Sequence, residues 1–229
     1  MGKKAAYKVL VVDDEEPIQE LLNYNLEKEG YDVKTASNGQ VGVEIARRFK
    51  PDLVLLDIMM PVMDGVEACR QLRAMPELAK TFIIFLTARS EEYSEVAAFD
   101  VGADDYITKP IKPRALMSRI NALFRRDSKS KPTASQIAMG ELIIDRSSYT
   151  IKLKDREINL PKKEFELLFF LAQHPNKVFS RDELLQHIWG ADVYVLARTV
   201  DVHIRKVREK IGEDYITTVK GVGYKFNTI

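Results

Sequence analysis

The sequence predicts two domains, a parallel β-sheet covered by helices on both faces and then a smaller α+β domain. Three observations indicate this division. Short apolar runs alternate with helical periodicity from Val9 to Phe124. One of these runs, Leu53–Leu56, is unbroken, as in a strand that is buried on both faces of a parallel sheet. Beyond a polar segment at 126–135, the pattern changes to short β segments, helices and a closing hairpin.

The first domain reads as five strands that alternate with five helices. The strands are expected at Val9–Val12, Tyr31–Ala36, Leu53–Leu56, Phe82–Leu86 and Tyr106–Ile107. The helices are expected from Pro17 to before Gly30, at Gly39–Phe49, after Asp64 and Gly65, around Tyr93–Val101 and at Arg114–Phe124. In the second of these helices, Val41, Val43, Ile45 and Ala46 are expected to face inward.

Residues 126–135, RDSKSKPTAS, are polar, contain a proline and lack periodicity, which indicates a flexible linker. We therefore expect domains at 1–125 and 136–229. In the second domain, β segments are expected at Glu141–Ile144, Thr150–Leu153 and Arg156–Leu160. Helices are expected at Pro161–Gln173, Arg181–Trp189 and Thr199–Ile211, followed by a hairpin of Tyr215–Val219 and Tyr224–Phe226.

The charge balance differs between the two halves, although the whole chain carries only +1. Residues 1–127 contain 18 Lys and Arg against 21 Asp and Glu, and residues 128–229 contain 17 against 13. An acidic half and a basic half predict different partners. No apolar segment approaches the roughly 20 residues that span a bilayer, and the start lacks a signal-peptide pattern. We therefore expect a cytoplasmic protein, and the single Cys69 excludes an internal disulfide.

Polar and charged side chains follow the ends of the predicted strands. Asp13 and Asp14 follow the first strand, Asp57 the third, Thr87 the fourth and Lys109 the fifth. Because the carboxyl ends of parallel strands share one edge of a sheet, we expect these side chains to converge. Clustered carboxylates need a cation, and oxygen ligands without His or Cys favour Mg²⁺. A carboxylate can also accept a phosphoryl group, with a metal ion and a lysine neutralising the transferring oxygens.

Nearly all of residues 7–125 resemble the receiver domain of bacterial two-component response regulators. The resemblance rests on VLVVDDEE, DLVLLDIMMPVMDG, FLTAR and GADDYITKP, which occur in the family's order and spacing. It implies a flavodoxin-like (βα)5 fold, phosphorylation by a sensor histidine kinase, Mg²⁺ as cofactor and a cis peptide bond between Lys109 and Pro110. It also implies that the protein is no enzyme beyond the receiver's own phosphotransfer and autodephosphorylation.

The resemblance assigns roles to the matched residues. Asp57 is the phosphoacceptor, Thr87 and Lys109 contact the phosphoryl group, and Tyr106 is an aromatic switch. Each residue alone has a plainer interpretation, such as a solvated charge for Lys109 or a core position for Tyr106. Those interpretations are hard to accept for all the residues at once.

The metal ligands carried over in the same way are Asp13, Asp14, Asp57 and the backbone carbonyl of Met59. A phosphohydrolase of the haloacid dehalogenase type is the rival enzymatic interpretation, since it also uses an aspartate nucleophile. That class places a second Asp two residues after the nucleophile, where this chain has Met59. The receiver interpretation is therefore favoured.

Residues 136–229 resemble the winged-helix DNA-binding domain of the OmpR/PhoB subfamily of response regulators. The resemblance rests on KKEFELLFFL, FSRDELLQHIWG, RTVDVHIRKVREKI and ITTVKGVGYKF. In the third motif, Val200, Ile204, Val207 and Ile211 share one face and are expected to dock on the core. The opposite basic face fits a helix in the major groove, and the hairpin fits a wing against phosphates or the minor groove. The expected DNA contacts are Arg198, Thr199, Val202, His203, Arg205, Lys206, Thr217, Lys220 and Lys225.

The resemblance also implies further partners. The loop GADVYVLA after Trp189 is similar to the loop that contacts RNA polymerase in this family, although Trp189 fits a core anchor equally well. The family dimerises through the fourth helix, fifth strand and fifth helix. Asp104, Asp105 and Arg119 stand where that dimer forms intersubunit ion pairs, whereas Glu95 and Ala115 replace the usual partners of one pair.

Two functions stay open at this point. The first is a transcription regulator that is phosphorylated on Asp57, dimerises through the receiver and binds tandem promoter half-sites. The second is a constitutive DNA-binding regulator whose receiver acts as a phosphate sink or a dimerisation scaffold. The complete acidic site favours the first.

Overall fold

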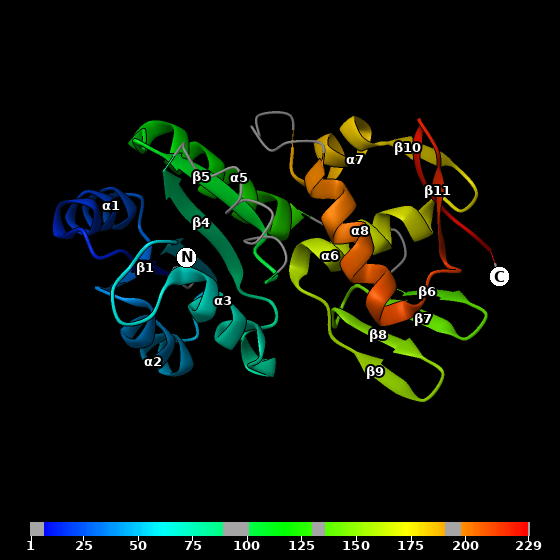
Figure 1. Cartoon of the computed structure of the whole chain (residues 1–229), viewed down its shortest axis with the longest axis horizontal. Helices are drawn as coiled ribbons and strands as arrows, with labels where there is room; N and C mark the ends of the chain where they lie inside the picture. Colours follow the sequence, from blue (N-terminus) through cyan, green and yellow to red (C-terminus); the bar gives the residue numbers. More distant parts are fainter. Residues whose placement is uncertain (1–6, 89–100, 130–135, 191–197, 229) are drawn as a thin grey trace, which may run out of the picture. The chain divides into compact units, whose positions relative to one another are not determined.

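The structure is a computed structural model that describes residues 7–88, 101–129, 136–190 and 198–228 (Figure 1). The chain divides into two compact units, Met1–Ser130 and Lys131–Ile229. Among the helices within these described ranges, none has the length and apolar character needed to cross a membrane.

A five-stranded parallel sheet forms the centre of the first unit, in the order β2-β1-β3-β4-β5. Its strands are β1 (Lys8–Val12), β2 (Asp32–Ala36), β3 (Leu53–Asp57), β4 (Phe82–Ala88) and β5 (Asp105–Lys109). The described helices are α1 (Glu16–Lys28), α2 (Gly39–Phe49), α3 (Gly65–Arg73) and α5 (Pro113–Lys129), with a 3-10 turn η1 (Pro76–Leu78). The predicted parallel α/β fold is confirmed. The helix expected around Tyr93–Val101 falls almost entirely on residues outside the described part.

The sheet is buried on both faces, as the unbroken apolar run predicts. Every residue of β3 is buried. Alternate residues of a strand point to opposite faces, and one face packs against apolar residues of α1 and α5. On the other face, α2 lies so close to β1 that a Cβ at Gly42 would meet the Val12 side chain at 2.9 Å. The sheet order changes direction between β1 and β3, the position at which such sheets bind ligands.

Helix α2 begins and ends where the sequence predicts, but it buries a different set of residues. The Asn38 side chain caps it by accepting a hydrogen bond from the Val41 amide, and Lys50 ends it in the left-handed conformation. Val41 was expected to face inward and is 37% exposed. The buried positions follow the helical spacing i, i+3, i+4, i+7, which leaves Val41 on a flank. They are Gly39, Gly42, Val43, Ala46 and Phe49.

Helix α5 is longer than the sequence pattern predicts. It continues to Lys129, so residues 126–129, assigned above to the linker, extend the helix. None of these residues is Gly or Pro, and the first helix-breaking residue of the segment is Pro132. A polar composition alone therefore did not reveal the helix end.

The second unit begins with a four-stranded antiparallel sheet, in the order β6-β7-β8-β9. Its strands are β6 (Gln136–Met139), β7 (Leu142–Asp145), β8 (Thr150–Leu153) and β9 (Arg156–Ile158). Helices α6 (Lys162–Gln173), α7 (Arg181–Ile188) and α8 (Arg198–Ile211) follow. The closing sheet has the order β10-β12-β11, with β10 (Val178–Ser180), β11 (Ile216–Val219) and β12 (Gly223–Phe226). The predicted α+β winged-helix fold is confirmed, and among the described strands only the short β6 and β10 were not predicted.

The helices of this unit pack as their periodicity predicts. Val200, Ile204, Val207 and Ile211 of α8, expected to dock on the core, are buried. Helix α6 is also apolar inside, with Phe165, Leu168, Phe169, Leu171 and Ala172 buried. A capping box between Ser180 and Glu183 starts α7. Gly223 serves a packing role in β12. A Cβ there would lie 1.9 Å from the Phe179 carbonyl oxygen of β10, so only glycine allows the two strands to pair.

Candidate functional site

Lys109 lies at the centre of the acidic site at the carboxyl edge of the parallel sheet. Its Nζ lies 3.1 Å from Asp13 Oδ2 and 3.2 Å from Asp57 Oδ2. It also donates a hydrogen bond of 3.0 Å to Glu15 Oε1. The structure thus brings together side chains from the ends of β1, β3 and β5, as the sheet topology requires. Glu15 is an addition, because the sequence pattern predicts no role for it.

Thr87 and Tyr106 lie on the neighbouring strands. Asp57 pairs in register with Leu86, so Thr87 is the next residue along β4 towards the carboxyl edge. Both Thr87 and Tyr106 are buried, at 3% and 7% exposure. Tyr106 pairs with Phe85 and is the second residue of β5. The strand register therefore sets Thr87 beside the acidic site and Tyr106 further from the edge, and the switch role of Tyr106 stays a prediction.

Three carboxylates of this edge are arranged to hold a cation. One oxygen of each of Asp13, Asp14 and Asp57 lies within 4.8 Å of the other two. Asp13 Oδ2 is buried and accepts no hydrogen bond from the described residues, although the Lys109 ammonium lies 3.1 Å away as its ion-pair partner. A buried carboxylate oxygen without a hydrogen bond, in a site that offers only oxygen ligands, fits Mg²⁺. Met59 follows Asp57 by two residues and is 67% exposed. The role of its carbonyl as a metal ligand stays a prediction.

Burial and repulsion from nearby carboxylates raise the pKa values of two carboxyls in the site. Burial, and then the nearby charge of Asp13, raise the pKa of Asp57 from 3.8 to about 6, against the opposing effect of Lys109. Burial also raises the pKa of Asp13. Burial would lower the pKa of Lys109, but the hydrogen bond to Glu15 and the nearby charges of Asp57 and Asp13 outweigh it and raise that pKa, so the lysine keeps its charge. One lysine does not balance the carboxylates, and an added cation would stabilise their ionised forms.

The loop after β3 fixes the Asp57 side chain. The Ile58 amide donates a 2.9 Å hydrogen bond to Asp57 Oδ1. Gly65 closes the loop, because its amide bonds to the Ile58 carbonyl and a Cβ there would lie only 2.0 Å from the Asp57 carbonyl oxygen. Between them, Val62 has a φ of +71° and is 80% exposed. A β-branched residue in this conformation is strained.

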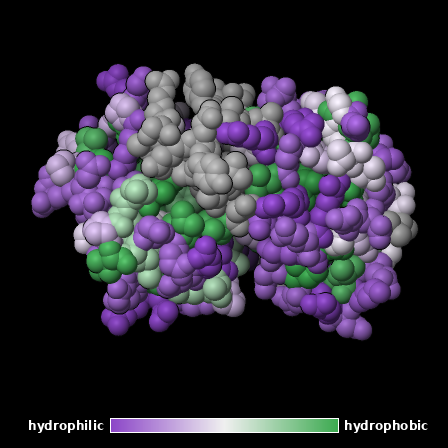
Figure 2. All heavy atoms as spheres, in the orientation of Figure 1, coloured by the Kyte–Doolittle hydropathy of each residue, from purple (hydrophilic) through white to green (hydrophobic). Residues whose placement is uncertain are grey.

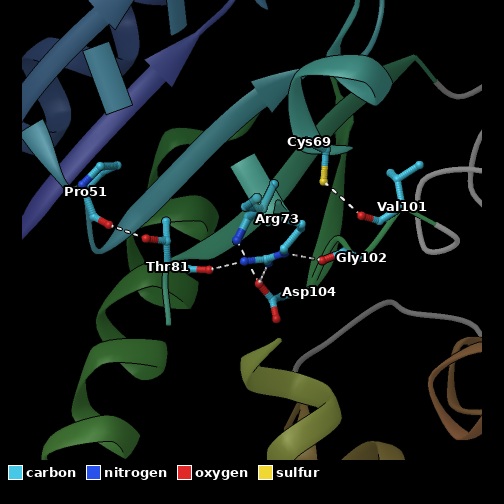
Figure 3. Close-up of polar contacts among 8 residues, drawn as sticks. Pro51, Cys69, Arg73, Thr81, Val101, Gly102 and Asp104 are labelled. Carbon is cyan, nitrogen blue, oxygen red and sulfur yellow. Dashed lines mark hydrogen bonds and ion pairs between the residues drawn. The ribbon is translucent and has the colours of Figure 1, made fainter. Parts of the chain in front are cut away.

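Figure 3 shows a second polar cluster in this unit, made around Arg73 at the end of α3. Its guanidinium donates to the carbonyl oxygens of Gly102 and Thr81, at 2.7 Å each, and to Asp104 Oδ2 at 2.5 Å. Asp104 is fully buried and also accepts from the Ile83 amide. Asp104 was expected in an ion pair between subunits, and this burial contradicts that prediction.

The other dimer residues give a mixed picture. Asp105 and Arg119 lie 4.0 Å apart within the same receiver. Ala115 is exposed, and Glu95 lies outside the described residues.

Cys69, also in Figure 3, is buried and its Sγ lies 3.6 Å from the Val101 carbonyl oxygen. Burial raises the pKa of its thiol to about 12, as expected for a small packed residue instead of a reactive thiol.

Helix α8 presents only part of the surface expected to contact DNA. Arg198 and Arg205 are exposed, and Val202 and Lys206 are half-buried. Thr199 and His203 are buried, at 1% and 3% exposure, which contradicts the prediction that they contact DNA. They lie between the basic and the apolar face of the helix, where neighbouring elements decide exposure. In the space-filling view, the surface over α8 is mostly hydrophilic (Figure 2).

Trp189 accounts for part of this burial. Its ring and the His203 ring form a T-shaped contact with centroids 4.9 Å apart, and His203 Nδ1 lies 2.9 Å from the Thr199 carbonyl oxygen. Trp189 is 4% exposed, and the Lys163 ammonium lies 5.5 Å from its ring centroid. Trp189 is therefore a core anchor, one of the two roles considered above. The loop after it, residues 191–197, lies outside the described part.

The hairpin β11–β12, called the wing below, carries the other expected contacts. Lys220 is exposed in the turn, where Val222 donates a hydrogen bond to the Val219 carbonyl and Gly221 takes a φ of +77°. Thr217 and Lys225 are partners across the two strands. By strand alternation these two lie on the face opposite Thr218 and Tyr224. Lys220 is thus the basic side chain at the tip of the wing.

Comparisons with known proteins agree with this geometry. The model of the response regulator receiver domain matches residues 9–121, and that of the C-terminal domain of transcriptional regulatory proteins matches residues 155–226. The alkaline phosphatase synthesis transcriptional regulatory protein PhoP of Bacillus subtilis (strain 168) is 43% identical over 231 residues, covering 95% of each chain. The solved structure of DrrB, an OmpR/PhoB homolog of Thermotoga maritima, is 36% identical, with a TM-score of 0.51 over 97% of this chain and 99% of its own. A solved mutant of RitR is 28% identical, with a TM-score of 0.78 over 98% of this chain and 100% of its own.

Fold and comparisons together define the class as a receiver joined to a winged-helix DNA-binding domain. The chain belongs to the OmpR/PhoB group of two-component response regulators, which are DNA-binding transcription regulators. The cis peptide bond expected between Lys109 and Pro110 is present. Receivers bind Mg²⁺ at an acidic pocket, and Asp13, Asp14 and Asp57 form such a cluster here.

Proposed function

We propose that a partner histidine kinase phosphorylates Asp57 and that this modification controls promoter binding by the second unit. The observation that carries the proposal is the set of contacts around Lys109, whose Nζ lies 3.2 Å from Asp57 Oδ2 and 3.1 Å from Asp13 Oδ2. A buried carboxylate beside a cation and an orphan acceptor suits phosphoryl transfer, in which charge on the moving oxygens must be neutralised.

Each residue has a distinct part in the transfer. An Asp57 oxygen forms a bond to phosphorus while the bond from phosphorus to the donor nitrogen breaks. Asp13, Asp14, Asp57 and the Met59 carbonyl would hold Mg²⁺, which when bound neutralises phosphoryl oxygens. Lys109 supplies a second positive charge, and the Thr87 hydroxyl donates a hydrogen bond to a phosphoryl oxygen.

The response to phosphorylation starts from Thr87. Its movement towards the new phosphoryl group vacates space on β4, and Tyr106 on the adjacent strand rotates inward. This changes the surface of the fourth helix, β5 and α5, through which two copies pair. A homodimer then places two winged helices on tandem half-sites, so that two weak contacts act together.

The proposed DNA contacts are Arg198, Val202, Arg205 and Lys206 of α8, and Thr217, Lys220 and Lys225 of the wing. Arginine and lysine read guanine edges or phosphates, and the apolar Val202 suits a thymine methyl group. We expect the protein to act in the cytoplasm, with RNA polymerase as a further partner.

The alternative is constitutive DNA binding with the receiver as a phosphate sink or scaffold. One observation favours this alternative. Asp104 is buried in an ion pair with Arg73 of the same receiver, so it does not form an ion pair between subunits. Under this alternative, phosphorylation of Asp57 occurs but leaves DNA affinity and sedimentation unchanged.

The site assignment is tested by labelling the full chain with acetyl phosphate and Mg²⁺ and locating the phosphoryl group by mass spectrometry. The wild type and Asp52→Asn should be labelled, because Asp52 lies exposed before β3, at the other end of that strand. Asp57→Asn should not be labelled, and Lys109→Ala should react more slowly. A label that persists in the Asp57→Asn variant would overturn the assignment.

A further inference from the structure

Two side chains of α8 bond to the wing, one from each half of the helix. They are Asp201 and Arg208, which are seven residues apart, or about two helical turns, and so lie on the same side of α8. Arg205 is four residues after Asp201 and therefore lies between them on nearly the same side. The helix residue expected to read DNA is thus bracketed by two residues that hold the wing.

Arg208 holds strand β11. Its Nε and one terminal nitrogen donate to the Ile216 carbonyl oxygen at 3.0 and 2.7 Å, and that same terminal nitrogen donates to Thr218 Oγ1 at 2.9 Å. Its guanidinium carbon lies 5.7 Å from the centroid of the Tyr224 ring. The planar fork of arginine suits this set of acceptors, which a lysine could not reproduce.

Asp201 holds strand β12. Its Oδ1 accepts a 2.6 Å hydrogen bond from the Tyr224 hydroxyl and a 2.7 Å bond from Arg181 Nε at the start of α7. Burial, and then the bond to Asp201, raise the pKa of Tyr224 to about 12, so the phenol keeps the proton that it donates. Arg181 also lies over the Tyr224 ring, at 5.1 Å from its centroid. The tyrosine therefore contacts a guanidinium from α7 and another from α8.

The chain between helix and wing is exposed, although Asn227, which follows β12, donates hydrogen bonds to the Asp214 carbonyl and to Thr217. Gly212, Glu213 and Asp214 are exposed, and Gly212 takes a φ of +98° with nothing within 4 Å of a Cβ. Strand β12 pairs with β10 along Gly223–Lys225, which anchors one strand of the wing, whereas β11 is the edge strand and the turn at 220–222 lies beyond the pairing. Side-chain contacts to α8 therefore add restraint to β11 and to the turn that it leads into. Isolated surface ion pairs contribute little, but here each α8 side chain makes two or more contacts of good geometry in one shared network.

We infer that Asp201, Tyr224 and Arg208 form a brace that sets the position of the wing relative to α8. These are positioning residues, and this inference rests on the proposed DNA contacts of Arg205 and Lys220. With the brace intact, α8 and the wing tip meet the same duplex together. Without it, β12 stays paired with β10, but β11 and the turn at 220–222 are less restrained, so fixing them against DNA carries an entropic cost.

A double-mutant cycle in the full chain tests the brace, with a duplex selected by the wild type from a random-sequence library as the probe. Arg208→Gln should weaken binding about tenfold, in the range for residues of one network. In the Lys220→Ala background the same change should cost less than about twofold, because the wing no longer contributes a contact to lose. Lys210→Gln is the matched control, since it removes a cation of α8 that contacts Glu164 and not the wing.

Tyr224→Phe is the second variant, because it keeps the ring and removes the two bonds of the hydroxyl, the one that it donates to Asp201 and the 3.4 Å bond that it accepts from Arg181. It should show the same dependence on Lys220, with an unchanged thermal midpoint followed by Trp189 emission. If a brace substitution weakens DNA binding by the same factor in the wild-type and the Lys220→Ala backgrounds, the inference is overturned. Arg208 would then have a DNA contact of its own or a general stabilising role. An unchanged affinity of Lys220→Ala, or of both brace variants, would overturn it as well.

Discussion

Replacing Asp57 by asparagine should stabilise the metal-free protein at neutral pH. The Asp57 carboxyl is 5% exposed and shares its site with Asp13, and burial is the largest cause of its raised pKa. Moving a pKa from 3.8 to about 6 corresponds to about 3 kcal/mol against the ionised folded state, at about 1.4 kcal/mol per pKa unit. Asparagine removes the charge and keeps an oxygen for the Ile58 amide, so we expect a gain of about 1 to 3 kcal/mol.

The pH dependence follows from the direction of this pKa change. Below about pH 4 the carboxyl is protonated in the folded and the unfolded chain, so Asp57 does not lower stability there. As the pH rises from about 4 to 6, the unfolded chain gives up its proton first, and the wild-type folded state loses stability. Above about pH 6 the full difference between wild type and variant persists.

The assay is urea unfolding of the full chain in EDTA from pH 4 to 8. Hydrogen exchange of the β3 amides is the probe that reports unfolding of the receiver. Trp189 is the only tryptophan and lies in the second unit, so its emission serves as an internal control that should not change. Asp52→Asn, which alters an exposed carboxylate, should have little effect. Saturating Mg²⁺ should stabilise the wild type and shrink its deficit relative to Asp57→Asn. Equal stability of variant and wild type at pH 7.5, or an equal gain at pH 4, would refute the reasoning.

Three other substitutions test the packing and the buried charges of the first unit. Val62→Asn should raise stability by about 1 kcal/mol, because asparagine tolerates a φ of +71° better than a β-branched residue does; an unchanged unfolding midpoint would show that the loop stores no strain. Arg73→Met should lower stability of the receiver by about 3 to 5 kcal/mol, because it leaves Asp104 buried without its ion pair; urea unfolding measures this, and a loss below about 1 kcal/mol would contradict it. Gly65→Ala should both destabilise the receiver and slow labelling by acetyl phosphate, because the added Cβ would displace the Asp57 backbone; labelling at the wild-type rate would count against that role.

Much of the receiver was predictable from local patterns. Its central strands are buried on both faces and read as apolar runs, and glycine or proline residues stand at several helix ends. Helix α2 has the bounds that the sequence predicts, since Asn38 caps its start and Lys50 closes its end. Strand β3 extends one residue beyond the apolar run, to include Asp57 itself. The carboxyl ends of parallel strands share one edge of a sheet, and this rule alone predicted that Asp13, Asp57 and Lys109 lie together. It did not predict the contacts between them.

The contacts that sequence reasoning missed depend on neighbours that are distant along the chain. Glu15 bonds to Lys109 across 94 positions, and nothing in the run of acidic residues marks which one turns inward. Arg73 and Asp104 are 31 positions apart, and each looks like an ordinary surface charge. Such pairs are visible only once the fold brings the end of α3 to the residue before β5, and the start of α1 to the end of β5.

The winged helix shows the same limit on a single helix. Periodicity separates the apolar from the basic face of α8, but it does not decide the exposure of the positions between them. His203 is covered because Trp189 meets its ring, and Asp201 faces the wing because Tyr224 and Arg181 are there. Tertiary neighbours override the pattern at these flanking positions.

The central claim is that phosphorylation of Asp57 controls DNA binding, and one measurement tests it most directly. The affinity of the full chain for a selected duplex is determined with and without acetyl phosphate and Mg²⁺, for the wild type and for Asp57→Asn. We predict about tenfold or tighter binding of the treated wild type, as dimers gain avidity on tandem half-sites, and no response of Asp57→Asn. A treated wild type that is phosphorylated but binds with unchanged affinity would contradict the account and support the constitutive alternative.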